Sequence, residues 1–194
     1  MNDFERCIAD GGVALFPADT VYGLACDPES AAAVERLYAI KGRPADRPAA
    51  VMFFALEPAL AALPALGPRT RGALELLLPG PVTLLLPNPE HLFPLACGPA
   101  PERLGLRVPD VPQLADMRRP ALQSSANPSG GSDARRVEEV DERIRNEVDL
   151  VIDGGELPGT PSTVIDLTEY EDGGKYAVVR AGALAPDELE RRLR

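Results

Sequence analysis

Short apolar runs alternate with segments of helical periodicity along most of the chain. Buried strands are predicted by the apolar runs at residues 13–16, 49–54 and 82–86. An alternating pattern predicts a further strand at 103–109, and strands are also expected within 149–155, 162–167 and 175–182. Helical spacing predicts helices at about 28–40, 68–81, 111–118 and 186–193. The segment 121–144 predicts a strand, a loop of small residues and an amphipathic helix, in that order.

The helix expected at about 28–40 has signals at both ends. Asp27 suits the N-cap position and Pro28 the first helical position. A glycine and a proline just beyond the helix are stop signals. Lys41 and Arg43 are therefore expected at the helix end and in the loop that follows.

This alternation of strands and helices favours an α/β or mixed α+β fold, in which helices pack on a sheet. The 194 residues are enough for one well-buried core, and the prolines are spread along the chain rather than gathered at a hinge. We expect a single domain that covers residues 1–194. The strand order cannot be read from the pattern.

The formal net charge of −10 argues against a protein that binds nucleic acid mainly through contacts with the phosphate groups. A local basic groove on an acidic protein stays open. The N-terminus has acidic residues where a signal peptide needs basic ones, and no apolar run reaches the roughly 18 residues needed to cross a bilayer. A cytoplasmic protein without a membrane contact is therefore expected.

Cysteine and histidine offer little chemistry. Cys7, Cys26 and Cys97 lack the paired spacing of a zinc or redox site, so free, buried thiols are expected. His91 is the only histidine, which excludes a multi-histidine metal site.

The KGRP element at residues 41–44 has two interpretations. Basic residues near a helix C-terminus complement its dipole, and glycine and proline then end the helix. Alternatively, the compact ammonium of Lys41 reaches between phosphate oxygens, a task for which the planar guanidinium of arginine is no substitute. Lys41 is one of only two lysines in an arginine-rich chain, which adds some weight to the second interpretation.

Four other elements are each ambiguous when taken alone. The loop 124–132 (SSANPSGGS) can present N–H groups to an anion, or can be an ordinary turn. Ser162 opens a strand and Arg180 ends another, and each suits either a structural role or a ligand contact. Arg103 and Arg107 share one face of a predicted strand, where they would make a positive patch.

The order and approximate spacing of these elements resemble the YrdC/TsaC family, the threonylcarbamoyl-AMP synthases. The matching motifs are PADTVYGL, KGRP, PGPVT, RLGLRVP, SSAN followed by SG, STVID and VVRAG, which together span about residues 10–183. The resemblance implies a twisted mixed sheet with helices around a concave, positively lined cavity. The chain looks like the short, single-domain form of the family.

The resemblance also implies an activity. A nucleotidyltransferase of this family makes threonylcarbamoyl-AMP and pyrophosphate from L-threonine, bicarbonate and ATP, with Mg²⁺ accompanying the ATP. Its product feeds the threonylcarbamoyladenosine modification of tRNA, so downstream transfer proteins are expected partners, and a weak RNA contact is left open.

The resemblance also implies roles for individual residues, at the positions of this sequence that match the family motifs. The resemblance implies that the catalytic and nucleotide-binding set is Lys41, Arg43, Ser125 and Asn127. It adds Arg103 and Arg180 to the ATP site, and it implies that threonine is held by Thr20, Arg107 and Ser162. No residue is expected to be a dedicated metal ligand.

The sequence departs from the usual family pattern near the expected threonine site, at Ala18, Met52, Pro161 and Ala181. Two rival functions remain open: an RNA-binding module that uses the same concave face, and an enzyme that makes a related adenylate such as carbamoyl-AMP. The amino acid that stimulates pyrophosphate release discriminates between the two enzymes.

Overall fold

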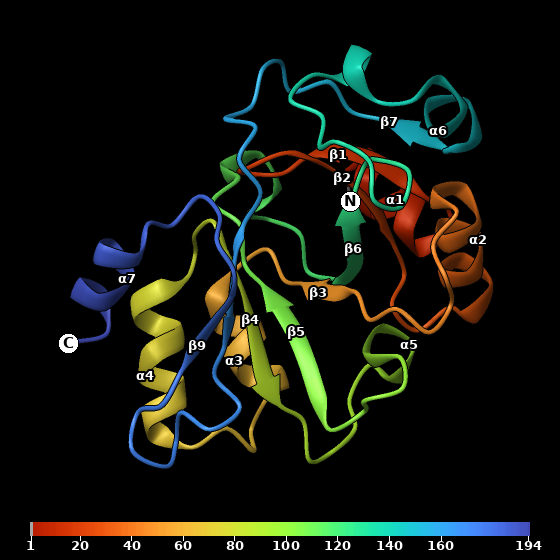
Figure 1. Cartoon of the computed structure of the whole chain (residues 1–194). Helices are drawn as coiled ribbons and strands as arrows, with labels where there is room; N and C mark the ends of the chain where they lie inside the picture. The colour runs from red at the N-terminus through yellow and green to blue at the C-terminus, as the bar shows by residue number, and fades with distance from the viewer. Residues whose placement is uncertain (1) are drawn as a thin grey trace.

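A nine-stranded mixed sheet runs through the molecule (Figure 1), in the order β7-β1-β2-β6-β3-β5-β4-β8-β9. The computed structural model describes residues 2–194. Three strand pairs are parallel, namely β1 with β7, β3 with β5, and β4 with β8, and the other pairs are antiparallel. The strands are β1 (Ala14–Pro17), β2 (Tyr22–Cys26), β3 (Ala50–Met52), β4 (Val82–Pro87), β5 (Arg103–Arg107), β6 (Ala121–Ser125), β7 (Leu150–Val151), β8 (Thr163–Asp166) and β9 (Ala177–Arg180).

Seven α-helices of the described residues surround this sheet, together with two short 3₁₀ turns. Figure 1 shows α2 close to β1 and β2, and α4 and α7 on the same side as β4 and β9. The helices are α1 (Asp3–Ala9), α2 (Ala31–Lys41), α3 (Leu56–Ala62), α4 (Pro68–Leu77), α5 (Pro94–Cys97), α6 (Glu142–Glu147) and α7 (Pro186–Arg192), and the 3₁₀ turns are η1 (Pro112–Leu114) and η2 (Val137–Glu139). The expected mixed α/β architecture is confirmed.

The two faces of the sheet are covered unequally. One face contributes Leu24, Val51 and Leu106 to the main core, which also holds Leu37 of α2 and Leu74 of α4. Since side chains alternate along a strand, the residues between them point to the other face.

On that second face, α1 covers only one part of the sheet. Phe4 of α1 packs against Phe16 and Phe54, with ring centroids 5.1 and 5.7 Å apart, and Met52 belongs to the same cluster. Two residues before Met52 in β3, Ala50 lies on the same face but lines an open cavity. The uncovered part of this face is therefore available for a ligand.

Helix α2 begins later than the sequence pattern predicts. Ser30 is the N-cap, and its side chain accepts a hydrogen bond from the backbone N–H of Ala33. Asp27 instead accepts from the N–H of Glu29 at 2.8 Å, so it closes a turn before the helix. The predicted N-cap at Asp27 and helical start at Pro28 were wrong, whereas the predicted end at Lys41 is confirmed.

Other differences are local. The helix expected near 111–118 is only the turn η1, and the amphipathic helix expected after the loop 124–132 consists of η2 and α6. Cys26 and Cys97 are buried free thiols as expected, and Cys7 is free but half-buried. Within residues 2–194, no helix combines the length and the apolar character needed to cross a membrane.

Candidate functional site

A cavity of about 180 Å³ opens on the uncovered part of the sheet, where segments distant in the sequence converge. Three arginines line it: Arg43 follows α2, Arg107 ends β5 and Arg180 ends β9. Ser125 and Ser162 line the same cavity. The structure therefore brings five of the nine predicted site residues around one positively lined hollow.

Lys41 supports the wall of this cavity. Its side chain is only 2% exposed, and its ammonium donates to the main-chain oxygens of Ser125 and Asn127, the latter at 2.7 Å. It also donates to Oδ1 of Asn127 at 3.1 Å, and the hydroxyl of Ser125 donates to the same Oδ1 at 2.6 Å. An ammonium has three N–H donors, and all three have acceptors in this loop. Lys41 thus fixes the loop 125–127, and it is not among the residues that line the cavity.

The environment of Lys41 disfavours its charge. Burial and the positive charge of Arg43 lower the pKa of Lys41 to about 8, while Asp133 acts in the opposite direction. Asp133 also lines the cavity and is the one carboxylate side chain among its lining residues. The charge of Lys41 is therefore sensitive to pH in a range where an ordinary lysine is fully protonated.

Arg43 reaches the cavity because the chain turns sharply after α2. Gly42 is the C-cap and adopts the left-handed conformation with a φ of 60°, which glycine tolerates best. The guanidinium of Arg43 donates to the main-chain oxygen of Pro48 and lies 5.6 Å from the centre of the Tyr38 ring. Its buried Nε has no hydrogen-bond partner among the described residues. Arg43 thus retains a donor that an acceptor from a ligand can satisfy.

Arg107 has a similar unsatisfied donor. Its Nη2 lies 2.6 Å from Oδ1 of Asp19 and 3.4 Å from the hydroxyl of Thr20, whereas its buried Nε has no partner among residues 2–194. Burial lowers the pKa of Arg107, Asp19 opposes that shift, and the nearby charge of Arg180 adds to it. Thr20 is fully buried beside the arginine. The predicted threonine-binding residues Thr20 and Arg107 therefore lie together.

Ser162 joins this group through a chain of hydroxyls. Arg180 donates through Nη2 to the main-chain oxygen of Ser162 at 2.7 Å and to its Oγ at 3.1 Å. The Oγ of Ser162 also lies 2.8 Å from Oγ1 of Thr83 in β4, which lines the cavity as well. Arg180 can only donate, and the bond between the two hydroxyls uses one of their two O–H groups. The other O–H is therefore free to donate a hydrogen bond to a ligand.

Arg103 lies apart from the other predicted residues. It begins β5, four residues before Arg107, and its guanidinium is 3.2 Å from Oδ2 of Asp166. Its side chain is nearly half exposed and does not line the cavity. The expected joint patch of Arg103 and Arg107 is therefore not formed.

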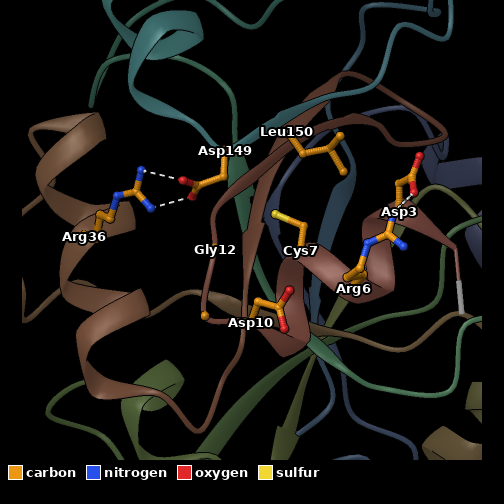
Figure 2. Close-up of a pocket in the computed structure, with 9 residues that line it drawn as sticks. Asp3, Arg6, Cys7, Asp10, Gly12, Arg36, Asp149 and Leu150 are labelled. Atoms are coloured by element: carbon orange, nitrogen blue, oxygen red, sulfur yellow. Dashed lines mark hydrogen bonds and ion pairs between the residues drawn. The ribbon is translucent and has the colours of Figure 1, made fainter.

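A second and wider pocket, of about 440 Å³, lies between α1, α2 and the start of β7 (Figure 2). Figure 2 shows Arg36 directed toward Asp149 and Arg6 close to Asp3, and both arginines form ion pairs with these carboxylates. Cys7 lies between the two pairs, and burial raises the pKa of its thiol. Since its cations already have partners and none of the predicted residues lines it, we place the candidate site in the arginine-lined cavity.

Comparison with known families decides the classification. Residues 6–182 match the family model for Sua5, YciO and YrdC proteins, which is described as "Telomere recombination". The chain belongs to the Sua5/YciO/YrdC family. The family expected from the motifs is thereby confirmed.

Two curated members of the Sua5/YciO/YrdC family show how the chain compares in length. The chain is 32% identical to the threonylcarbamoyl-AMP synthase of Pyrococcus abyssi over 189 residues, which cover 95% of this chain and 54% of that protein. It is 34% identical to the threonylcarbamoyl-AMP synthase of Pseudomonas aeruginosa over 167 residues, which cover 84% of this chain and 89% of that protein. The chain thus spans about half of the archaeal protein and most of the bacterial one.

A solved structure supports the same fold. The crystal structure of P. abyssi Sua5 complexed with L-threonine matches with a TM-score of 0.83 and 30% sequence identity. The match covers 97% of this chain and 56% of that one. The YrdC-like fold is therefore present across nearly the whole chain.

Sequence reasoning assigned no role to several residues that line the cavity, among them Thr83, Gln123 and Asp133. Thr83 belongs to the PGPVT motif, which gave a signal for its neighbourhood but not for its hydroxyl. Gln123 precedes the SSAN loop by one residue, within a strand whose pattern predicts only burial. Asp133 has no sequence signal, because an acidic residue in a polar loop is unremarkable without the fold.

Proposed function

We propose that the chain is a threonylcarbamoyl-AMP synthase, which forms threonylcarbamoyl-AMP and pyrophosphate from L-threonine, bicarbonate and ATP. The observation that carries the proposal is the convergence of Arg43, Arg107 and Arg180 with Ser125 and Ser162 on one cavity. The names of the two curated relatives and the L-threonine complex of P. abyssi Sua5 support it.

The residue types suit a reaction that needs positioning more than a protein nucleophile. The amine of threonine and bicarbonate combine to a carbamate and water, and a carbamate oxygen then attacks the α-phosphorus of ATP as pyrophosphate leaves. Guanidinium groups fixed before the substrate arrives stabilise charge that grows on the phosphate oxygens. Orientation of two reactants in one site can supply roughly 7 to 11 kcal/mol of the barrier.

The cavity has two ends with different chemistry. Arg43 and Ser125, with Asn127 and Lys41 behind them, form one end, which we assign to the nucleotide. Arg107 and Ser162 form the other end, which we assign to the amino acid, and Thr20 lies behind Arg107. Arg180 contacts Ser162 and acts electrostatically on Arg107, and we propose that it also contacts the nucleotide from the amino-acid end.

Mg²⁺ is proposed to enter with the triphosphate. Asp133 and Ser125 line the cavity and supply oxygen donors of the kind that Mg²⁺ accepts beside phosphates and water. A bound Mg²⁺ would offset negative charge on the phosphates. We further propose that the unstable product passes to proteins that transfer the threonylcarbamoyl group to tRNA.

The test is pyrophosphate release by the purified chain with ATP and Mg²⁺, with L-threonine and bicarbonate each omitted in turn. The proposal expects release only when both are present. Release with ammonia or carbamoyl phosphate in place of L-threonine would support the carbamoyl-AMP alternative instead, because these supply the nitrogen of a carbamoyl group. Binding of duplex RNA with no pyrophosphate release under any condition would support the RNA-binding alternative.

A further inference from the structure

Asp19 is a buried carboxylate that the proposed reaction has not used. It lies in the loop between β1 and β2, and its side chain is 7% exposed beside an Arg107 side chain that is 4% exposed. Burial raises the pKa of Asp19, although Arg107 acts in the opposite direction. A buried carboxylate is costly unless it is paired and hydrogen-bonded.

The bonds of Asp19 connect three parts of the chain. Its Oδ1 accepts from Nη2 of Arg107 at 2.6 Å, and its Oδ2 accepts from the backbone N–H of Asp110 at 3.3 Å, just beyond the end of β5. The adjacent Thr20 accepts through its main-chain oxygen from the N–H of Gly159 at 2.9 Å. Both oxygens of the carboxylate are thus held from the end of β5, and the loop that carries Asp19 is itself anchored by Gly159.

This anchoring occupies Nη2 of Arg107 and leaves other N–H groups of its guanidinium free. Nη2 is engaged by Asp19 and Thr20, whereas Nε is buried and has no partner among the described residues. Arg107 lines the cavity and Asp19 does not, so the ion pair lies at the cavity wall with the arginine on the inner side. Because all N–H groups of a guanidinium lie in one plane, the bonds at Nη2 fix the direction in which its other N–H groups point.

Among residues 2–194, Asp19 is the one negative charge that acts strongly on Arg107. Asp110 bonds Asp19 through its backbone rather than its carboxylate, and the other charge acting strongly on Arg107 is Arg180, which repels it. We propose that Asp19 is the positioning residue for Arg107, which it holds through Nη2 so that the remaining N–H groups of the guanidinium receive the carboxylate of the amino-acid substrate. This inference rests on the proposed function, because it assigns the amino-acid end of the same cavity.

The variants Asp19→Ala and Asp19→Asn separate the parts of this role. Asp19→Ala removes the anchor, whereas Asp19→Asn keeps the shape and one acceptor but removes the charge. Asp116→Asn is the matched control. Asp116 is exposed, so this substitution removes the same charge from the surface of the protein. Circular dichroism checks the fold of each variant, and Asp19→Asn, which is nearly isosteric, carries the test if Asp19→Ala does not fold.

Two ligands make the test specific for the carboxylate. Binding of L-threonine and of L-threoninamide, which lacks the carboxylate, is measured by calorimetry without nucleotide, and the KM for each substrate is measured by pyrophosphate release. Asp19→Ala should weaken L-threonine roughly 10- to 100-fold, the range of a lost hydrogen bond to a charged group. Asp19→Asn should fall between that variant and the native chain, with L-threoninamide binding and the KM for ATP unchanged in both.

The ratio of the affinities for L-threonine and L-threoninamide should therefore fall strongly in the Asp19 variants and stay unchanged in Asp116→Asn. Equal weakening of both ligands would overturn the inference, because it would show a general loss of structure. Tighter binding of L-threonine would also overturn it, because Asp19 would then be a competitor of the substrate carboxylate. If the native chain itself shows no threonine-dependent pyrophosphate release, it is the proposed function that fails.

Discussion

Asn127 accepts two hydrogen bonds from the ammonium of Lys41, at 2.7 Å on its main-chain oxygen and at 3.1 Å on Oδ1. The two residues are separated by 86 positions in the sequence. A third bond from the same ammonium reaches the main-chain oxygen of Ser125. The end of α2 therefore fixes the shape of the loop that forms one wall of the cavity.

Replacement of Lys41 by methionine should lower the stability of the fold. The variant removes three hydrogen bonds and leaves the main-chain oxygen of Asn127 without its donor, which should reduce the free energy of unfolding by about 1 to 3 kcal/mol. Urea denaturation measures this change. Lys175→Met is the control, because Lys175 is exposed in the turn before β9 and should change stability by less than about 0.5 kcal/mol. Equal stability of the two variants would contradict the role of Lys41 in fixing the loop 125–127.

The pKa of Lys41 can be measured almost in isolation. The chain has only two lysines, so selective ¹⁵N labelling of lysine gives two side-chain signals, and the exposed Lys175 serves as the reference. The Lys41 signal should titrate with a midpoint near pH 8, because burial and Arg43 disfavour its charge. Pyrophosphate release should decline through the same pH range if the charged form shapes the site, and a rate that stays flat to pH 9.5, about 1.5 units beyond that midpoint, would contradict this.

The same shift predicts a pH dependence of stability. Between about pH 8 and the ordinary lysine value of 10.5, Lys41 is largely deprotonated in the folded chain but still protonated in the unfolded chain. The unfolded state therefore binds more protons, so the contribution of Lys41 to the free energy of unfolding rises with pH across this window. Denaturation of the native chain and of Lys41→Met at several pH values should show this rise in the difference between them.

Arg107→Ala should be more harmful to stability than most substitutions. It leaves Asp19 as an uncompensated buried charge, which costs about 3 to 5 kcal/mol. The double variant Asp19→Asn, Arg107→Ala removes both charges and should recover part of this loss in the same urea measurement. Additive losses in the two single variants and the double variant would show that the pair is not coupled.

Gly182 is predicted to be essential for the geometry of Ser162. A Cβ at this position would lie 2.3 Å from the main-chain oxygen of Pro161 and 2.5 Å from the carbonyl carbon of Ser162, closer than real atoms approach. Gly182→Ala should therefore move this segment, break the contact of Ser162 with Arg180, and destabilise the fold by about 1 to 3 kcal/mol. Raised KM values for L-threonine and ATP would report the displacement.

Gly72→Ala is the control for that substitution. Gly72 lies in α4, and a Cβ there meets no atom within 4 Å. Because alanine is the better helix former, this variant should be more stable than the native chain by about 0.5 to 1 kcal/mol, with unchanged kinetics. Similar behaviour of the two glycine variants would contradict the account of Gly182.

The sequence predicted most of the strands because their signal is local. The apolar runs at β1, β3 and β4 and the alternation in β5 are confirmed within two residues at each end. The strand β2 was missed, since TVYGLAC mixes glycine and polar residues with apolar ones although all five residues of β2 are buried. Helix α3 was missed as well, because its segment LEPALAA carries a proline and a short, weak pattern.

The candidate site was predictable only in part. The family motifs named the residues that converge on the cavity, but neither spacing nor periodicity could indicate that Lys41 bonds a loop 86 residues away. Alternation correctly gave Arg103 and Arg107 one face of β5, yet four residues along a strand span about 13 Å, which is enough to carry Arg103 to Asp166 and away from the cavity. The use of Asp19 as the partner of Arg107 likewise depends on the tertiary contact between a loop and a distant strand.

The most direct test of the central claim follows the carbon atom of bicarbonate. The purified chain is incubated with ATP, Mg²⁺, L-threonine and ¹³C-bicarbonate, and the adenylates formed are analysed by mass spectrometry. The account predicts threonylcarbamoyl-AMP that carries the labelled carbon, absent without L-threonine and strongly reduced in Arg107→Lys, which keeps the charge but loses the planar fork. A labelled adenylate that forms without threonine, or the absence of any labelled adenylate from active, folded protein, would contradict it.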